Sequence, residues 1–525
     1  MKRLSWLATL AFAATLSACG GGGGSTIPPP PPTGGFSVSS LKGQYAFSMS
    51  GLDTGGAYLA RAGSFVADGA GNITSGMEDV VDLGTGTAAE VTFGASNYSV
   101  LANGRGVIVL KDSSGSGGLT LTMDLQSPSQ GFLVHTDTGI NATATSGNFN
   151  LQTTADFLAT SFNGNYVFDF SGADSSGVNT SIIGNIAANG SGAITGGVID
   201  TNDGTYGPSG PVALTLPGTF ALDPTYGATF GRGTAQFAGH TYAFYVVDAT
   251  QIMFLQEDSL GGSSGNAVLQ TGTIPTQNSG FTSSFAYLVG GQSIAGPDAA
   301  VARFTVSGPG TIGTISYDEN NDGTHIPITQ GTNISNATYA IDTTNAGSGR
   351  GTLTFTDSSH GTFQYVFYLI SPTSGVIQDV RTGIVADGTL LSQTGAPFTF
   401  AGLAANYVFN WNGVDLSSSS VENFVGQYVL ASSSSNNISG VVDGTILGAS
   451  GFGGGSVNAF NDIGAQGTLT INTDGTNSNP YQIVAGNPLG NTYNYQAYIV
   501  DANTVFLVGT DNTRVLAGFV SRQSQ

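Results

Sequence analysis

One stretch of sequence decides the fold, because the chain uses it four times. Leu41-Lys-Gly-Gln-Tyr-Ala-Phe-Ser-Met-Ser-Gly51 recurs without gaps at 162–172, 281–291 and 403–413, with offsets of 121, 119 and 122 residues. This spacing is far longer than the roughly 20 to 45 residues of a solenoid coil. We therefore expect four homologous domains in tandem.

The residues of this stretch alternate between large apolar side chains and small or polar ones. Tyr45, Phe47 and Met49 point to one side, whereas Ala46 and Ser48 point to the other. A period of two predicts a β strand with one buried face. The same alternation returns at Tyr166, Phe168 and Phe170 and at Tyr407, Phe409 and Trp411.

Two further blocks recur in the copies. The block at 65–73 contains Asp-Gly-Ala-Gly-Asn, which predicts a hairpin turn because glycine adopts positive φ readily; it returns at 186–194 and 304–312. The tripeptide Gly-Arg-Gly occupies 104–106, 231–233 and 349–351, and we align it with Ala465-Gln466-Gly467 in the last copy. The first three copies close with related strands that end at Gln152, Gln270 and Gln393.

The first copy contains about eight expected strands with short connections and no helical pattern. They lie near 44–50, 59–67, 72–80, 88–93, 96–101, 105–111, 119–125 and 131–137, with a ninth at 147–152. This pattern predicts an all-β protein of four tandem antiparallel meander domains, each a closed or nearly closed β-barrel, with a β-sandwich as the alternative. The barrel is favoured because closure leaves no exposed strand edge.

The repeats and the composition shifts divide the chain into six segments. They are a signal peptide at 1–18, a Gly/Pro-rich tether at 19–39, and β-repeats at 40–154, 160–274, 280–396 and 401–525.

Composition narrows the function. Charged residues make up 9% of the 525 residues, against about 25% in ordinary globular proteins. Hydrophobic residues at 40% suffice for buried cores. With 12 basic against 33 acidic residues, the formal charge of −21 argues against unassisted nucleic-acid binding.

The N-terminus has the pattern of an export signal. Lys2 and Arg3 precede an apolar run that ends in Leu16-Ser17-Ala18-Cys19, and Cys19 is the single cysteine. This ending resembles the lipobox of bacterial lipoproteins. The resemblance implies that residues 1–18 are removed and that lipid on Cys19 attaches the protein to a membrane. Gly20 after the cysteine implies the outer membrane by the same analogy, with the leaflet left open.

The first strand carries a second resemblance. Its opening Gly43-Gln44-Tyr45 is similar to the Gly-x-Trp start of lipocalin-type barrels, with tyrosine in place of tryptophan. The resemblance covers three residues and implies a barrel.

No set of residues predicts catalysis. The five glutamates do not recur at equivalent positions in all copies, so they indicate no shared acid/base pair. The four histidines lie near no Gly-x-Ser-x-Gly elbow and have no zinc-ligand spacing. We expect no catalytic residues, no enzyme activity and no cofactor other than calcium.

One segment fits the opening of a calcium loop. Asp318, Asn320 and Asp322 precede Gly323 in the order Asp-x-Asn-x-Asp-Gly. Position twelve is Thr329 instead of the bidentate glutamate. The alternative is an Asn-Asp-Gly hairpin turn.

Recurring arginines and aspartates suggest ion pairs. Arg105, Arg232 and Arg350 stand at strand starts, and aspartates end the third strand of each copy, at Asp79, Asp200, Asp318 and Asp443. A buried guanidinium needs a carboxylate, so we expect structural pairs between the arginine and the aspartate of one copy. Binding of an anionic ligand is the alternative.

Three strands are apolar on both faces, which leaves Tyr245, Tyr368 and Tyr498 pointing outward from the barrels. They are explained either by packing against a neighbouring domain or by an aromatic platform for a carbohydrate or another ligand.

Together these features predict a lipid-anchored envelope protein with a structural, adhesive or weak ligand-binding role. Its partners would be the membrane and a carbohydrate, a small apolar ligand or an envelope protein. One alternative is a carrier that holds small apolar molecules inside its barrels, and another is a secreted hydrolase. An open or a filled barrel interior discriminates between the first two.

Overall fold

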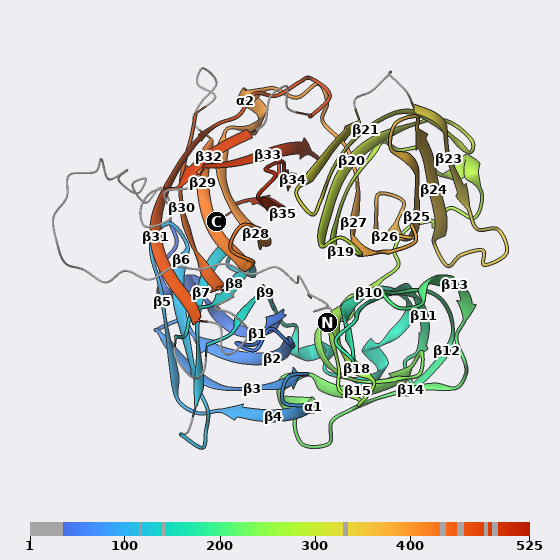
Figure 1. Ribbon diagram of the computed structural model, residues 1–525. Coiled ribbons are helices and arrows are strands. Elements are labelled where there is room, and N and C mark those ends of the chain that lie inside the picture. Colours follow the sequence, from blue (N-terminus) through green and yellow to red (C-terminus); the bar gives the residue numbers. More distant parts are fainter. Residues whose placement is uncertain are drawn as a thin grey trace, which may run out of the picture.

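The chain folds into four closed antiparallel barrels, one for each repeat (Figure 1). The computed structural model describes residues 35–115, 117–138, 142–328, 334–430, 437–448, 456–476, 481–485 and 492–524. The expected signal peptide and Cys19 lie outside the described residues. The all-β class and the closed barrels expected from the sequence are confirmed, so the sandwich alternative does not apply.

The first barrel has nine strands in eight positions. Its sheet order is β2-β1-β9-β8-β7-β6-β5-β3-β4, and the pairing of β2 with β3 closes it. Both β4 and β5 pair with β3, so these two act as one interrupted strand. The strands are β1 (Lys42–Leu52), β2 (Tyr58–Asp68), β3 (Asn72–Asp82), β4 (Thr87–Phe93), β5 (Ser96–Val100), β6 (Arg105–Lys111), β7 (Gly118–Ser127), β8 (Gln130–His135) and β9 (Ala144–Leu151).

The second and third barrels repeat this order. The second consists of β10 (Asn163–Asp174), β11 (Asn179–Asn189), β12 (Ala193–Asp203), β13 (Gly207–Ala213), β14 (Gly218–Leu222), β15 (Arg232–Phe237), β16 (His240–Asp248), β17 (Gln251–Gln256) and β18 (Gly261–Leu269). The third consists of β19 (Phe285–Ser293), β20 (Pro297–Gly308), β21 (Thr311–Asn321), β22 (Thr324–Ile328), β23 (Ile334–Ile341), β24 (Arg350–Asp357), β25 (Gly361–Ser371), β26 (Ser374–Asp379) and β27 (Ile384–Ser392).

The fourth barrel closes with each strand paired to its neighbour along the chain. Its strands are β28 (Ala405–Asp415), β29 (Ser420–Leu430), β30 (Asn437–Gly448), β31 (Ser456–Thr468), β32 (Tyr481–Ala485), β33 (Thr492–Ile499), β34 (Thr504–Gly509) and β35 (Arg514–Arg522).

Helices are short and lie at the barrel ends. They are α1 (Gly227–Phe230), α2 (Phe400–Leu403) and the single 3-10 turns η1 (Val38–Ser40), η3 (Thr154–Asp156), η4 (Ala159–Ser161) and η5 (Asn278–Gly280). Within the described ranges, no helix has the length and hydrophobicity needed to cross a bilayer.

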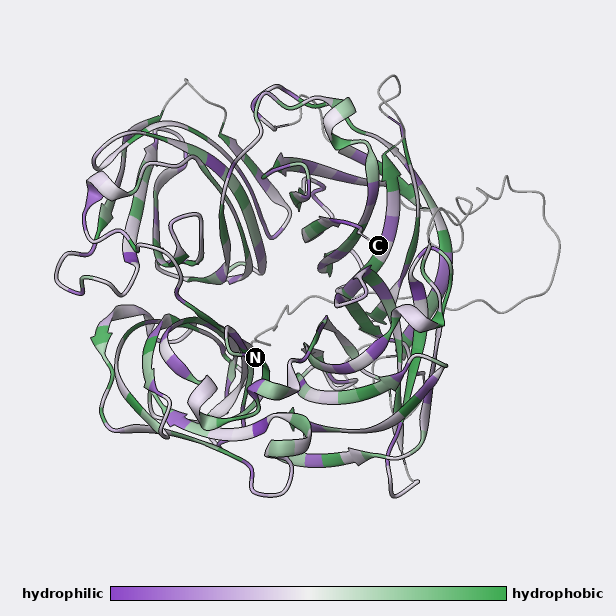
Figure 2. Ribbon diagram, turned by 180° about the vertical axis from the view of Figure 1, so that it is seen from behind, coloured by the Kyte–Doolittle hydropathy of each residue, from purple (hydrophilic) through white to green (hydrophobic). Residues whose placement is uncertain are grey.

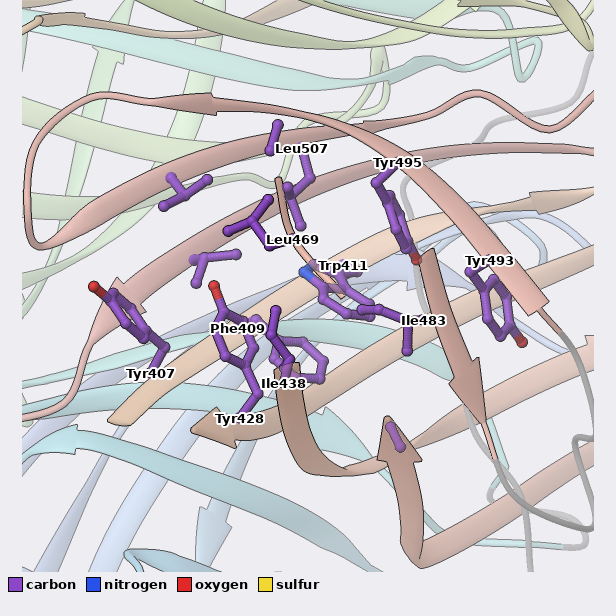
Figure 3. Close-up of a cluster of buried hydrophobic side chains, with 14 of the residues drawn as sticks. Tyr407, Phe409, Trp411, Tyr428, Ile438, Leu469, Ile483, Tyr493, Tyr495 and Leu507 are labelled. Carbon is purple, nitrogen blue, oxygen red and sulfur yellow. The ribbon is translucent and has the colours of Figure 1, made fainter. Parts of the chain in front are cut away.

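Aromatic side chains fill the barrel interiors, as the alternation in the first strands predicts. In the fourth barrel, Tyr407, Phe409 and Trp411 are each about 1% exposed, and Phe409 stacks on Trp411 with ring centroids 3.9 Å apart (Figure 3). Similar clusters form the cores of the other three barrels. Hydrophobic and hydrophilic residues are correspondingly interspersed along the strands (Figure 2).

The geometry explains why glycine flanks the recurring arginine. The first glycine of the tripeptide has positive φ, for example +69° at Gly231, because it turns the chain into the strand. At the second glycine a Cβ atom would lie 2.2 Å from the Phe244 ring at Gly233 and 2.3 Å from the Phe367 ring at Gly351. Glycine is therefore required for the aromatic core to approach this strand.

The four barrels form a ring in chain order, and the fourth barrel contacts the first (Figure 1). Three of the four junctions lie between barrels that follow one another in the chain. The junction between the fourth and first barrels closes the ring without a covalent connection between them.

Candidate functional sites at the junctions and the ring axis

A buried ion pair joins the first two barrels. Arg232 of barrel 2 donates from Nε and Nη2 to the two carboxylate oxygens of Asp79 in barrel 1, each at 2.8 Å. Tyr245 donates its hydroxyl to Asp79 at 2.7 Å. Asp223 accepts the third guanidinium bond at 2.7 Å. Because Asp79 is 1% exposed, this pair is fully desolvated on the carboxylate side.

The second and third barrels meet in the same way. Arg350 donates to both oxygens of Asp200 at 2.7 and 2.8 Å. Tyr368 donates to the same carboxylate at 2.6 Å. The arginine and the tyrosine of each copy therefore hold the aspartate of the preceding copy.

A glutamine at the end of each copy completes every junction. Its amide nitrogen donates to two backbone carbonyls of the next barrel at 2.6 to 3.1 Å. The glutamines are Gln152, Gln270, Gln393 and, at the ring closure, Gln523. The same two positions of the partner barrel accept in each case, so the ring has fourfold pseudosymmetry.

The junction between barrels 3 and 4 lacks the arginine. Tyr498 still donates to Asp318 at 2.7 Å, but Thr476 pairs with Tyr498 where arginine stands in the other copies. His325 of the same barrel contacts Asp318 instead, at 2.8 Å. A reversed ion pair compensates, because Arg303 of barrel 3 reaches Asp474 of barrel 4 at 3.1 Å.

The ring closure keeps the arginine and loses the tyrosine. Arg105 of barrel 1 forms a two-bond contact with Asp443 of barrel 4 and also binds Asp462. The position opposite Arg105 in the strand pairing, which holds tyrosine in barrels 2 and 3, holds Asp124. Both Asp124 oxygens lack a hydrogen-bond partner among the described residues. Burial and the charge of Asp443 raise the pKa of Asp124 to about 8.

These contacts correct three expectations from the sequence. Pairing within one copy is wrong, because Arg232 binds Asp79 and not Asp200. Tyr245, Tyr368 and Tyr498 offer no exposed platform, since each is at most 1% exposed and packs at a junction. The alignment of Gly-Arg-Gly with 465–467 is also wrong: those residues lie in β31, and Gly475-Thr476 takes the equivalent place.

The calcium segment forms a hairpin. Asp322 and Gly323 connect β21 to β22, both with positive φ, as in a tight two-residue turn. Asn320 donates to three carbonyls of barrel 4 at 2.8 to 3.0 Å, and the Asp318 oxygens bind His325 and Tyr498. The calcium expectation therefore gives way to its alternative, the hairpin turn.

A cavity of about 510 Å³ lies on the ring axis. All four barrels contribute to its lining, mainly through the first and last strands of barrels 1, 3 and 4 and through β10 and β11 of barrel 2. Amide and hydroxyl groups from Asn148, Asn412 and Thr389 lie beside the rings of Phe132 and Phe519. No lysine, arginine or histidine is among the described residues that line it. This cavity therefore brings residues of all four copies together.

Two carboxyl groups with buried oxygens interact where barrels 2 and 3 meet, and one of them, Asp387, lines this cavity. Asp169 of barrel 2 and Asp387 of barrel 3 each keep one buried oxygen without a partner among the described residues, as does Asn410 of barrel 4. Burial raises the pKa of Asp387 to about 6. Burial and the neighbouring charge of Asp387 raise the pKa of Asp169. These atoms are acceptors that a ligand with hydrogen-bond donors would satisfy.

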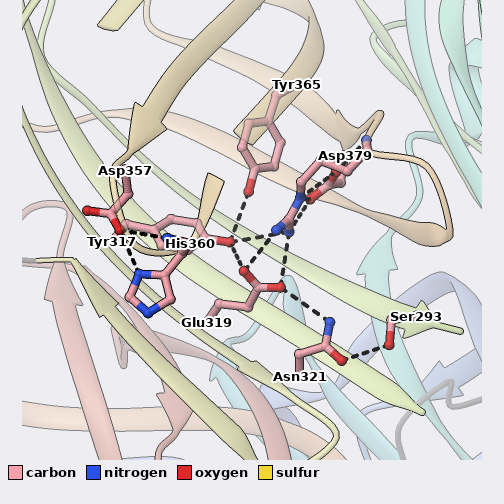
Figure 4. Close-up of polar contacts among 9 residues, drawn as sticks. Ser293, Tyr317, Glu319, Asn321, Asp357, His360, Tyr365 and Asp379 are labelled. Carbon is pink, nitrogen blue, oxygen red and sulfur yellow. Dashed lines mark hydrogen bonds and ion pairs between the residues drawn. The ribbon is translucent and has the colours of Figure 1, made fainter. Parts of the chain in front are cut away.

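Charged groups also occur inside the barrels, at one end. We call this end the mouth, and it is the end of the barrel at which its first strand ends. In barrel 3, Arg381 binds Glu319 at 3.0 Å and Asp379 at 2.6 Å, and Tyr317 donates to Glu319 (Figure 4). The guanidinium lies over the Phe363 ring, 4.7 Å from its centroid. This cluster lies in the mouth of barrel 3.

Barrels 1 and 4 place ion pairs at their mouths from other strand positions. Arg61 binds Glu78 at 2.7 Å in barrel 1, and Arg514 binds Asp415 at 2.5 Å and Glu422 at 3.3 Å in barrel 4. Sequence repetition could not reveal these clusters, because their members do not recur in register. The sequence signal that could have revealed them is a charged residue at an inward-facing position of a strand whose other inward-facing residues are apolar.

Comparison with known proteins adds only a distant likeness. No protein-family model matches the sequence, and no curated protein matches it either. Kievitone hydratase from Nectria haematococca is 10% identical over 50% of this chain and 98% of its own, with a TM-score of 0.21. An AttH-type protein from Nitrosomonas europaea is 9% identical over 70% of this chain and 96% of its own, with a TM-score of 0.17. A likeness at this level carries no functional conclusion.

Proposed function

We propose that the protein is a lipid-anchored, non-catalytic scaffold of the bacterial cell envelope whose four barrels act as one rigid ring. The observation that carries the proposal is the set of repeated junctions. Polar residues that recur between copies and lie outside the barrel cores bind neighbouring barrels, and Arg105 and Gln523 close the ring. Repeated side chains devoted to assembly favour a structural role.

The anchor rests on the sequence around Cys19. An apolar run followed by Leu16-Ser17-Ala18-Cys19 provides the site for lipid attachment. The Gly/Pro-rich segment that follows Cys19 spaces the ring from the lipid, and the expected tether of 19–39 ends earlier than its bound, because Phe36 already packs in the core of barrel 1. Lipid on Cys19 makes the membrane the protein's constant partner, and Gly20 favours the outer membrane.

The packed interiors argue against a carrier of apolar molecules. Each barrel buries a cluster of hydrophobic and aromatic side chains in its interior, including Phe168 and Phe170 in barrel 2, whose ring centroids are 4.7 Å apart, and the cavity of barrel 1 is confined to its mouth. A ligand in that position would have to displace these rings, at about 3–5 kcal/mol for each buried aromatic side chain.

Expression in a bacterium with two membranes tests the anchor. Mass spectrometry should find a diacylglyceryl-modified Cys19, and the protein should fractionate with the outer membrane. Cys19→Ser should move the protein to the soluble fraction, whereas Ser17→Ala, which keeps a small residue in the motif, should leave it in place. Unmodified wild-type protein in the soluble fraction would contradict the anchor.

A complementation experiment tests the scaffold in the producing bacterium. Deletion of the gene should increase sensitivity of the cells to detergent, and the wild-type gene should restore resistance. Arg105→Met, which opens the ring closure, should fail to restore it, whereas Asp387→Asn on the ring axis should restore it fully. Full rescue by Arg105→Met, or no change on deletion, would contradict a structural role of the ring.

A second candidate function is weak binding of a small polyhydroxyl ligand in the axial cavity. Its support is the buried acceptors of Asp387 and Asn410, which line the cavity and lack a partner among the described residues, together with amide and hydroxyl groups that can both donate and accept. Titration with glucose, followed by NMR, should show saturable binding that Asn410→Leu abolishes. Equal binding by the wild type and by Asn410→Leu would contradict this function.

A further inference from the structure

The mouth of barrel 1 contains a cavity. Its volume is about 420 Å³. Leu59, Val91, Phe93 and Leu119 form apolar walls, and polar groups gather on the opposite side. An apolar cleft with a few convergent polar groups is the usual form of a small-molecule site.

The polar side of this cavity is strongly acidic. It carries four carboxyl groups, from Asp53, Glu78, Asp82 and Asp112, and one guanidinium, from Arg61, so its net charge is −3 when all are ionised. Asp82 supports its own turn by accepting from the Gly84 amide at 2.8 Å through Oδ1, and Asp53 accepts from Ala57 at 2.7 Å through Oδ1. Turn formation thus engages one oxygen of each of these two residues.

Glu78 supplies an independent sign of a missing ligand. It is 2% exposed and lines the cavity. Its Oε1 accepts from Arg61 at 2.7 Å, but its Oε2 is buried without a hydrogen-bond partner among the described residues. A buried carboxylate oxygen without a donor costs about 1–3 kcal/mol or more, so a donor at this place would be stabilising.

The arrangement of the acidic side chains indicates whether the missing ligand is a metal ion or an organic cation. No group of three or more acidic, histidine or cysteine side chains converges closely enough to hold a metal among the described residues. An ammonium group needs no such convergence, since its three N–H donors form hydrogen bonds of ordinary length to separate acceptors. A bare ion would also leave the apolar walls of the cavity without a contact, whereas an organic cation would cover them.

We propose that the mouth of barrel 1 binds a small organic cation, a protonated primary amine on an apolar body. The ammonium group donates to Glu78 and is held by the charges of Asp82 and Asp53. The body packs against Leu59 and Phe93. In barrel 3 the guanidinium of Arg381 binds both carboxyl groups at the mouth, Glu319 and Asp379, so we expect no such site there.

Calorimetric titration of the mature full-length protein in detergent tests the site. The probe is 2-phenylethylammonium, compared with 2-phenylethanol and 3-phenylpropanoate, which have similar bodies. We expect saturable binding of the ammonium compound, at least tenfold weaker binding of the alcohol, and no binding of the anion.

Matched variants locate the binding. Asp82→Asn keeps the turn acceptor and removes only the charge, so it should weaken ammonium binding three- to tenfold. Asp203→Asn makes the same change at the equivalent position of barrel 2 and should have no effect. Val91→Phe should abolish binding by filling the cavity, and Asp387→Asn on the ring axis should leave it unchanged.

Four results would overturn the proposal. They are no heat of binding with millimolar probe, equal affinity for the ammonium compound and the alcohol, equal weakening by Asp82→Asn and Asp203→Asn, and loss of binding in Asp387→Asn. The last would assign the ligand to the axial cavity. The anchor and the scaffold role do not depend on any of these outcomes.

Discussion

Arg232→Met removes the guanidinium that joins barrels 1 and 2 and keeps a side chain of similar length. Asp79 then stays 1% exposed with the Tyr245 hydroxyl as its donor, after losing two charge-assisted bonds of 2.8 Å. Removing one partner of a buried pair costs about 3–5 kcal/mol. The contact of Arg232 with Asp223 adds little, because that carboxylate is partly exposed. We therefore expect a loss of about 3–5 kcal/mol in the free energy of unfolding.

Urea unfolding of a double-mutant cycle measures the coupling. Asp79→Asn should recover about 2 kcal/mol or more of the loss in Arg232→Met, because it removes the stranded charge. Asp200→Asn is the matched control, since it belongs to the copy of Arg232 but binds Arg350. Its effect should be additive with Arg232→Met. Coupling to Asp200 instead of Asp79 would refute the interpretation that the ion pairs join neighbouring barrels.

Three further predictions concern the ring closure and the cores. Burial and the charge of Asp443 raise the pKa of Asp124, so the folded protein binds this proton more tightly than the unfolded chain. The contribution of this proton to the free energy of unfolding should therefore be fully present below about pH 4 and should be lost as the pH rises through about 8. Asp124→Asn should remove this pH dependence in unfolding measured from pH 5 to 9. Gln523→Ala should cost about 1–3 kcal/mol and increase amide hydrogen exchange in β6 and β7, with β15 and β16 unchanged; uniform exchange would contradict it. Phe168→Ala should cost about 3–5 kcal/mol in urea unfolding, whereas Asp169→Asn, which relieves repulsion with Asp387, should be neutral or stabilising; equal losses would contradict the strand register.

Strands and barrels could be predicted because their signals are local and repeated. Alternation at Tyr45, Phe47 and Met49 identifies an inward face, and all three belong to the core of barrel 1. Closure followed from the number of strands and the shortness of their connections. These features do not depend on how one barrel sits against another.

The junctions could not be assigned in the same way. A repeated arginine and a repeated aspartate are equally compatible with pairing inside a copy and pairing between copies, because every copy contains both. The one indication of a neighbouring barrel was Tyr245, because a large aromatic side chain on the outward face of a strand needs another surface to cover it. In the fourth copy, Thr476 preserves neither the charge nor the size of the arginine, so the equivalent position could not be recognised.

The ring closure places the two ends of the folded chain side by side. Phe36 and Gln523 both lie against Gly104, where an added Cβ would be 3.1 Å from the Phe36 ring and 2.8 Å from the Gln523 amide nitrogen. All four junctions share the contacts of a glutamine amide with two backbone carbonyls of the next barrel, so no barrel is required to come first. A circular permutant that joins the present ends through a short linker and begins at the second barrel should assemble the same ring. The order of the barrels along the chain is thus one of four connectivities that are compatible with the same ring.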